Sequence, residues 1–398
     1  MKKRLEYFDV VKGIGAILVL LGHLQGDQIF SYSPYFLPMC EWIFSFHMPL
    51  FFIVSGMLIS YRNDISKDYN ETVKKRFKGI MIPYFWFCFF YMTVVIVALI
   101  KGEIAPYTLY LNLFYVLSMY GMSVLWFLPA LFLGEILFIF LIKKFGDKKG
   151  AGCVYALGAI ALILLVFVHK GTYETELLKR VHDVIITCLR PFVAATFVGA
   201  GYYGFKLVSG WLYRHDVVDC DAKAIKDMEA SSDCFVEVGP LQKFINTPVK
   251  QVVFDIALGI ILMIIGLLNV NHNHGVDFRS LVIKNYFFYY LCALTSSFGL
   301  ILICKHIRPF KILTFFGVNS LIFMGVHGSE TVVYWATQLA MWVNQFLTRA
   351  RGYICYAIIV LVILVYVSIM IVLINRFAPF ILGKPFSLKT VLKKTDKK

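Results

Sequence analysis

Apolar runs separated by short charged segments recur along the whole chain. Most runs hold about 20 residues, the length that an α-helix needs to cross a bilayer. They predict ten membrane-spanning helices, at 9–25, 41–60, 80–100, 124–142, 151–169, 183–205, 252–270, 285–304, 312–346 and 353–376. The ninth run is long, and glycine and serine residues predict a break within 325–329. The pattern therefore predicts an all-α fold of the polytopic integral membrane class.

The composition agrees with this pattern, since 59% of the 398 residues are hydrophobic and 16% are charged. An ordinary soluble protein is excluded by these values. With a cytoplasmic N-terminus, 29 of the 39 lysine and arginine residues lie in inside segments and 8 lie in outside loops. This asymmetry follows the positive-inside tendency. It predicts that both termini face the cytoplasm of a bacterial inner or plasma membrane, and it explains the net charge of +15 without a nucleic-acid partner.

The domain organisation is simple. We expect one transmembrane domain at 1–380 with a cytoplasmic insert at about 206–250, followed by a basic cytoplasmic tail at 381–398. The first helix is expected to stay uncleaved, because no A-x-A-like site follows its apolar run. An apolar run at 107–120 is too short to span and is expected to be interfacial or re-entrant. The nine cysteines occur singly, so we expect neither disulfides nor a metal site.

Lys12 and His23 are the two ionisable residues at the ends of an otherwise apolar, small run. An ionisable side chain in hydrocarbon costs about 2.5–3.5 kcal/mol, so each needs a partner, a watery cavity or an escape to the interface. Eleven helical positions bring the two residues back to the same side of a helix, about 16 Å apart along its axis. Either Lys12 reaches the inner headgroups and His23 caps the outer end, or both line one cavity between helices.

The second run places His47 before Pro49, which frees a backbone carbonyl in the preceding turn. His47 is expected either to bond such backbone or to line a site. Ser55 and Gly56 in the same run are interpreted as helix-packing residues, because small residues let membrane helices approach closely.

A dense cationic cluster precedes the third run, at Lys74, Lys75, Arg76 and Lys78. Positive-inside anchoring alone explains it. The functional alternative is an anion site for a phosphorylated cofactor, because guanidinium and ammonium groups bind phosphates well.

Further polar residues lie inside the later runs. Glu135 is predicted near the middle of the fourth span, and Arg190 is predicted within the sixth. An ion pair between them would explain why both charges lie in the membrane. Asn319 and His327 flank a glycine-interrupted segment and are expected to border one cavity. No phosphate-binding loop, nucleophile elbow or zinc-hydrolase motif is present, so those chemistries lack support.

Four stretches taken together resemble the membrane acyltransferase 3 family. They are YFDVVKGIGAILVLLGH, FSFHMPLFFIVSG, KKRFKGIMIPYFW leading to LWFLPALF, and FFGVNSLIFMGVHG. Each alone is an apolar pattern, but their order and spacing are specific. The family pattern has a basic residue, normally arginine, separated by ten residues from a histidine, and here Lys12 and His23 occupy these positions. Lysine lacks the planar two-pronged donor of arginine.

The resemblance implies an acyltransferase that uses acetyl-CoA and no metal, and acylates a hydroxyl of a surface polysaccharide or its lipid-linked precursor. It implies His23 as the base, with Lys12 polarising its cavity or stabilising charge on the thioester oxygen. Cofactor phosphates would bind Arg76, Lys78 and Lys75. Orienting groups or glycan contacts would come from His47, Trp126, Glu135, Asn319 and His327. Membrane lipids and polysaccharide-assembly proteins are the other expected partners.

The competing function class is a transporter or flippase for a free or lipid-linked glycan, which also tolerates intramembrane ionisable residues. Paired broken helices in two related halves are not evident in the sequence, which disfavours this class. A membrane sensor is disfavoured by the small soluble portion. Neither the acceptor nor the choice between acetyl and a longer acyl group follows from the sequence.

Overall fold

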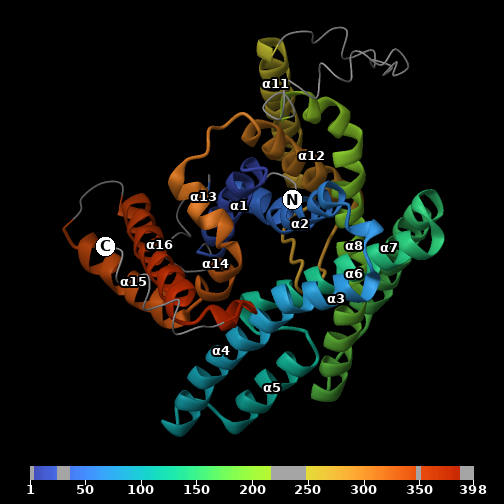
Figure 1. Cartoon of the computed structure of the whole chain (residues 1–398). Helices are drawn as coiled ribbons and strands as arrows, with labels where there is room; N and C mark the ends of the chain where they lie inside the picture. The colour runs from blue at the N-terminus through green and yellow to red at the C-terminus, as the bar shows by residue number, and fades with distance from the viewer. Residues whose placement is uncertain (1–3, 25–35, 217–247, 347–350, 386–398) are drawn as a thin grey trace, which may run out of the picture.

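The structure, a computed structural model, describes residues 4–24, 36–216, 248–346 and 351–385, and these residues form helices and connecting loops (Figure 1). The longer helices are α1 (Tyr7–His23), α2 (Phe36–Arg62), α4 (Ile82–Ile100), α6 (Phe127–Phe145), α7 (Asp147–Lys170), α8 (Glu176–Asp216), α11 (Pro248–Leu268), α12 (Tyr286–Cys304), α15 (Glu330–Asn344) and α16 (Arg351–Phe377). The shorter ones are α3 (Tyr69–Arg76), α5 (Pro106–Leu117), α13 (Lys311–Val318) and α14 (Ser320–Val326). The predicted all-α class is confirmed.

Eight helices among the described residues are long and apolar enough to cross a membrane. These spans are Met39–Arg62, Tyr69–Ile100, Ser123–Phe145, Asp147–Lys170, Glu176–Leu207, Val249–His272, Tyr286–Cys304 and Ile354–Phe377. Each corresponds to a span predicted from the sequence. The chain is therefore a polytopic membrane protein, and the cytoplasmic position of both termini stays a prediction.

The two remaining predicted spans differ from simple crossing helices. The first, α1, has 17 residues, so its length of about 26 Å falls short of a full hydrocarbon core. The ninth is divided into α13, α14 and α15, with breaks at Asn319 and at 327–329. The predicted break near Gly325 is confirmed. The short run after the third span forms α5, which has no buried residue and packs beside α4, in agreement with a non-spanning segment.

The expected insert and tail lie largely outside the described residues. Helix α8 extends to Asp216 and α11 begins at Pro248, so the part of the insert between them is not described. Of the tail, the structure describes a single helical turn at Pro379–Leu382 and the residues up to 385.

Helix α2 lies at the centre of the molecule, between α1, α8 and α12 (Figure 1). Glycines let its backbone touch that of α8. A Cβ atom at Gly56 would overlap the Val198 carbonyl oxygen, and one at Gly201 would overlap that of Ile53. Gly56 is thus a packing residue, as predicted.

Helices α1 and α13 meet in the same way. A Cβ at Gly13 would overlap the carbonyl oxygen of Leu313, and one at Gly317 would overlap that of Asp9. The glycine-rich first helix therefore allows the close neighbour that the sequence predicted. This contact fixes α13, and with it the following α14, against α1.

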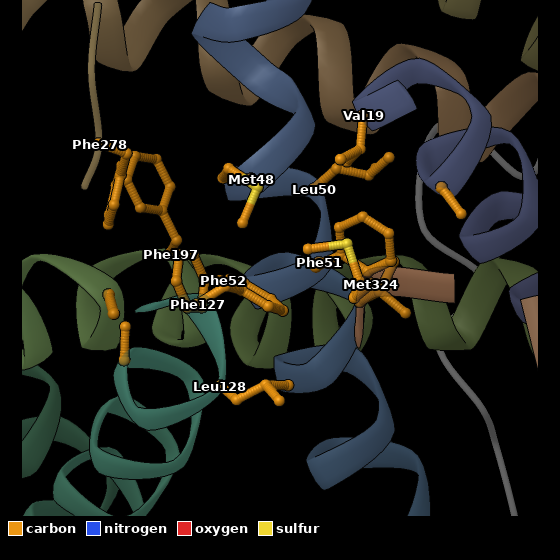
Figure 2. Close-up of a cluster of buried hydrophobic side chains, with 14 of the residues drawn as sticks. Val19, Met48, Leu50, Phe51, Phe52, Phe127, Leu128, Phe197, Phe278 and Met324 are labelled. Carbon is orange, nitrogen blue, oxygen red and sulfur yellow. The ribbon is translucent and has the colours of Figure 1, made fainter. Parts of the chain in front are cut away.

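Aromatic side chains fill the space where α2, α6 and α8 meet. Figure 2 shows Phe52, Phe127 and Phe197 grouped with Phe278, which comes from the loop after α11. The rings of Phe52 and Phe127 lie 5.1 Å apart between centroids, and those of Phe52 and Phe278 lie 5.4 Å apart. This cluster ties the 273–285 loop to the helix bundle.

We expect Gly56→Leu to reduce the yield of folded protein severalfold, because a side chain there forces α2 away from α8. Overpacking of this kind costs about 1–3 kcal/mol or more. The measurement is the amount of monodisperse protein in detergent and its melting temperature. Gly152→Ala in α7 is the control, since no described neighbouring residue lies within 4 Å of a Cβ at that position. Equal yields for both variants would contradict the packing role.

Candidate active site

Three histidines from separate segments of the chain meet. His23 is the last residue of α1, His47 lies inside α2, and His327 directly follows α14. The ring centroids of His23 and His327 are 5.6 Å apart, and those of His23 and His47 are 6.3 Å apart. His23 is exposed, whereas His47 and His327 are buried. The structure thus brings together three residues that the sequence singled out separately.

Hydrogen bonds fix the proton positions of the two buried rings. His47 Nδ1 donates to the carbonyl oxygen of Ile43 at 2.7 Å, and His327 Nδ1 donates to that of Phe323 at 3.0 Å. A carbonyl oxygen only accepts, so each Nδ1 carries the hydrogen and each Nε2 of the neutral ring is an acceptor. Among the residues that the structure describes, the Nε2 atom of His327 is buried and has no hydrogen-bond partner. His47 both bonds backbone and lines the site, which combines the two roles that the sequence left open.

A cavity of about 40 Å³ lies against this cluster. Its lining includes His23 and His47 together with Trp126, Asp277 and Phe278. Asp277 is near enough to interact electrostatically with His23. The site therefore combines an accessible imidazole with a nearby carboxylate, whose charge favours the protonated form of that imidazole.

Sequence reasoning did not identify Asp277. It lies in the loop that follows the seventh predicted span, outside every apolar run. The one available signal was that this acidic residue sits two positions from Arg279 in a loop with few charges. Trp126, which the sequence suggested as a contact, does line the cavity, and its ring stacks on Phe278 with centroids 5.8 Å apart.

Lys12 lies at the opposite end of α1. Its Nζ atom forms an ion pair with Asp9 at 2.9 Å, and Arg4 binds the same carboxylate at 2.7 Å. His23 is eleven positions after Lys12, about 16 Å along the axis. This placement does not bring Lys12 into the cavity that His23 lines, so a direct contribution of Lys12 to a reaction there stays a prediction.

The possible ion pair between Glu135 and Arg190 is not formed. Glu135 is buried and instead pairs with Arg76 Nη1 at 2.9 Å, while Ser55 donates a hydrogen bond to it. The other terminal nitrogen of Arg76 binds Asp64 at 2.8 Å. Arg76 projects from the end of α3 toward Glu135 on α6. This pairing depends on how α3 packs against α6, which the local sequence does not encode.

The cationic cluster is therefore divided in its roles. Arg76 is committed to two carboxylates, whereas Lys74, Lys75 and Lys78 are exposed. The exposed lysines are available to an anion on the predicted cytoplasmic side. Binding of a cofactor there stays a prediction.

Asn319 is not brought to the histidines. It lies at the junction of α13 and α14, where its side-chain oxygen accepts a hydrogen bond from Asn375 of α16 at 2.8 Å. The eight positions between Asn319 and His327 amount to about 12 Å along a helix. Asn319 thus stabilises the helix junction and does not share the cavity of His23.

Comparison with known families bears on what this arrangement does. A family model described as an acyltransferase domain, that of the acyltransferase 3 family, matches residues 5–373. The chain belongs to this acyltransferase family. The match includes the histidine cluster, the Arg76 network, seven of the eight spanning helices and most of the eighth.

Two relatives are both named nodulation protein NolL. The one from Mesorhizobium japonicum is 33% identical over 213 residues, which are 52% of this chain and 51% of that protein. The one from Sinorhizobium fredii is 39% identical over 87 residues, 20% of this chain and 22% of that protein. The alignments thus span about half or less of these relatives. No solved structure matches the chain.

We expect Arg76→Gln to destabilise the protein strongly, because it leaves Glu135 buried without its cation. Breaking a buried pair in this way costs about 3–5 kcal/mol. The measurement is the melting temperature in detergent, with exposed Lys75→Gln as the control. The double variant Arg76→Gln/Glu135→Gln should recover part of the loss. An Arg76→Gln protein with unchanged stability and a weakened acyl-donor affinity would instead favour a cofactor role for this arginine.

Proposed function

We propose that this protein transfers an acyl group, acetyl in the simplest case, from acyl coenzyme A to a hydroxyl of a glycan. The single observation that supports it most is the accessible His23, which stands beside Asp277 and two buried histidines in a chain of the acyltransferase family. Acyl transfer to an alcohol needs a base, and a thioester needs no metal to react. His23, which lines the cavity, can supply that base.

In the proposed reaction, neutral His23 accepts the proton of the acceptor hydroxyl while its oxygen attacks the thioester carbonyl carbon. The new C–O bond forms, the C–S bond then breaks, and the departing coenzyme A thiolate takes up the proton. Asp277 stabilises the imidazolium while it exists. A covalent acyl-His23 relay would use the same groups in two steps.

His47 and His327 would orient the acceptor. Because each Nδ1 hydrogen is used by a backbone carbonyl, each Nε2 offers an acceptor for an O–H or N–H group. Trp126 and Phe278 offer flat apolar faces, which suit the C–H faces of sugar rings. Buried acceptors of this kind favour a ligand that supplies hydroxyl donors.

The acyl donor would approach from the predicted cytoplasmic side, where the exposed Lys75 and Lys78 are available for its phosphates. His23 lies at the other end of α1. The thioester arm would therefore extend through the protein to reach the acceptor. Lys12, which is part of the Asp9 ion pair near the start of α1, stands on the donor side of this path.

We expect His23→Ala to lower acyl transfer about 100-fold or more while leaving membrane insertion intact, because general-base catalysis contributes about 10²–10⁴ in rate. The measurement is transfer of label from labelled acetyl coenzyme A to the acceptor by purified protein, together with the ester signal of the cellular glycan in proton NMR. His272→Ala, on an exposed histidine outside the cluster, is the control. Wild-type ester levels in the His23 variant would disprove the assignment. Acceptor flux without label would point to a transporter.

We expect Asp277→Asn to lower kcat about tenfold with little change in KM for the acceptor. The amide keeps an oxygen for the backbone N–H of Arg279, which Asp277 accepts at 2.9 Å, so the loop stays in place. The charge beside His23 is lost. Steady-state kinetics with the labelled donor measure this change, and Asp277→Glu should retain part of the activity. A higher KM for the acceptor with an unchanged kcat would instead assign Asp277 to acceptor binding.

A further inference from the structure

A cavity with a volume of about 920 Å³ lies beside the histidine site. Its walls come from α4, α5, the break between α14 and α15, and α16. Exposed side chains of both α4 and α16 form its rim, among them Phe90, Val94 and Phe377. The cavity therefore opens sideways, toward the hydrocarbon that surrounds a membrane protein. We call it the lateral groove.

The lateral groove changes character along its length. Toward the predicted cytoplasmic end it is lined by Phe87, Leu373, Ile374 and Ile381. Toward the predicted outer end it is lined by polar residues, which are Thr108, Asn112, Tyr115, Ser123 and Arg279. The pantetheine arm of coenzyme A carries two amides that would find few partners in the apolar part. A hydrocarbon chain with a polar head fits the whole groove.

Two arginines lie at the polar end of the lateral groove: Arg279 lines it, and Arg190 packs beside Arg279. Arg190 is 1% exposed, and its guanidinium donates to the carbonyl oxygens of Tyr120 and Arg279. Arg279 donates to the carbonyl oxygen of Gly121 at 3.0 Å. Among the described residues neither arginine forms an ion pair, and the Nε–H of each is buried without a partner. The neighbouring carboxylate of Asp183 is already paired with Arg180 at 2.9 Å.

The two arginines are held next to one another. Their guanidinium carbons lie 5.3 Å and 5.0 Å from the centroid of the same ring, that of Tyr120. Two like charges in one low-dielectric place repel each other, which favours an anion that neutralises both. Guanidinium groups bind phosphate oxygens particularly well. Charge complementarity thus selects an anionic head for the occupant of the groove.

The groove and the histidine cavity share their walls. Ser123 lines the groove, and the next residue, Val124, lines the histidine cavity. Likewise, Gly325 lines the groove and Met324 lines the histidine cavity. Arg279 lines the groove, whereas Asp277, two residues earlier in the same turn, lines the histidine cavity, and the Arg279 backbone N–H donates to the Asp277 carboxylate at 2.9 Å. A group attached to an anion at Arg279 would therefore stand beside His23.

From these features we propose that the lateral groove binds a polyisoprenoid phosphate carrier, with its hydrocarbon chain between α4 and α16 and its phosphate at Arg279. This inference rests on the proposed function in one respect: the carried glycan is then the acyl acceptor, and its sugars nearest the phosphate face His23. The binding site itself does not depend on acyl transfer.

The test is photocrosslinking of the purified protein in nanodiscs with a diazirine-bearing polyprenyl phosphate. We expect labelled peptides from α4 and α16, and competition by unlabelled polyprenyl phosphate but not by uncharged polyprenol or phosphatidylglycerol. Arg279→Gln should weaken binding roughly tenfold, since it removes one charge-assisted contact. Lys101→Gln is the matched control, because it removes a charge from the exposed outer loop beyond α4.

Ala98→Trp, which fills the groove from α4 and leaves the arginine contacts intact, should also abolish labelling. Labelling that phosphatidylglycerol displaces equally well, or that neither substitution reduces, would overturn the proposal. His23→Ala should bind the probe as wild type does. Probe binding without any acyl transfer would support the carrier site and reject the proposed function. Acylation of a soluble glycan without probe binding would support the proposed function and reject the carrier site.

Discussion

A charged side chain inside a membrane bundle needs compensation, because the surrounding hydrocarbon and packed helices do not replace the water that it loses. Buried carboxylates satisfy this requirement with neighbouring cations. Three examples are Asp9 with Arg4 and Lys12, Glu135 with Arg76, and Asp255 with Lys305 and His306. All three groups lie in the half of the bundle predicted to face the cytoplasm. The Glu135 pair joins α3 to α6 and the Asp255 pair joins α11 to the end of α12, whereas Arg4, Asp9 and Lys12 belong to α1 and the residues just before it.

The opposite half of the bundle is arranged differently. His47 and His327 present Nε2 acceptors there, and the guanidinium groups of Arg190 and Arg279 donate to carbonyl oxygens. Ion pairs are present in this half as well, such as that of Arg180 with Asp183 at 2.9 Å. What distinguishes it is that His23, His47, Asp277 and Arg279 line two neighbouring cavities.

Backbone contacts through glycine set the positions of these groups. The overlap of α1 with α13 at Gly13 and Gly317, and of α2 with α8 at Gly56 and Gly201, leaves no freedom to slide. His23, His47 and the segment that ends in His327 are carried by α1, α2 and α14, so their meeting follows from these crossings. The same rigidity holds the loop with Asp277 and Arg279, through Phe278 in the aromatic cluster.

The sequence by itself determined the helices, because an apolar run of about 20 residues has one stable form in a bilayer. It also marked His23, His47 and His327 as polar residues in need of an explanation. Only the tertiary structure decided that these three meet, that Glu135 pairs with Arg76 and not with Arg190, and that Asp277 joins His23. Helix periodicity gives the direction of a side chain from its own axis, whereas its partner depends on which helices cross and at what height.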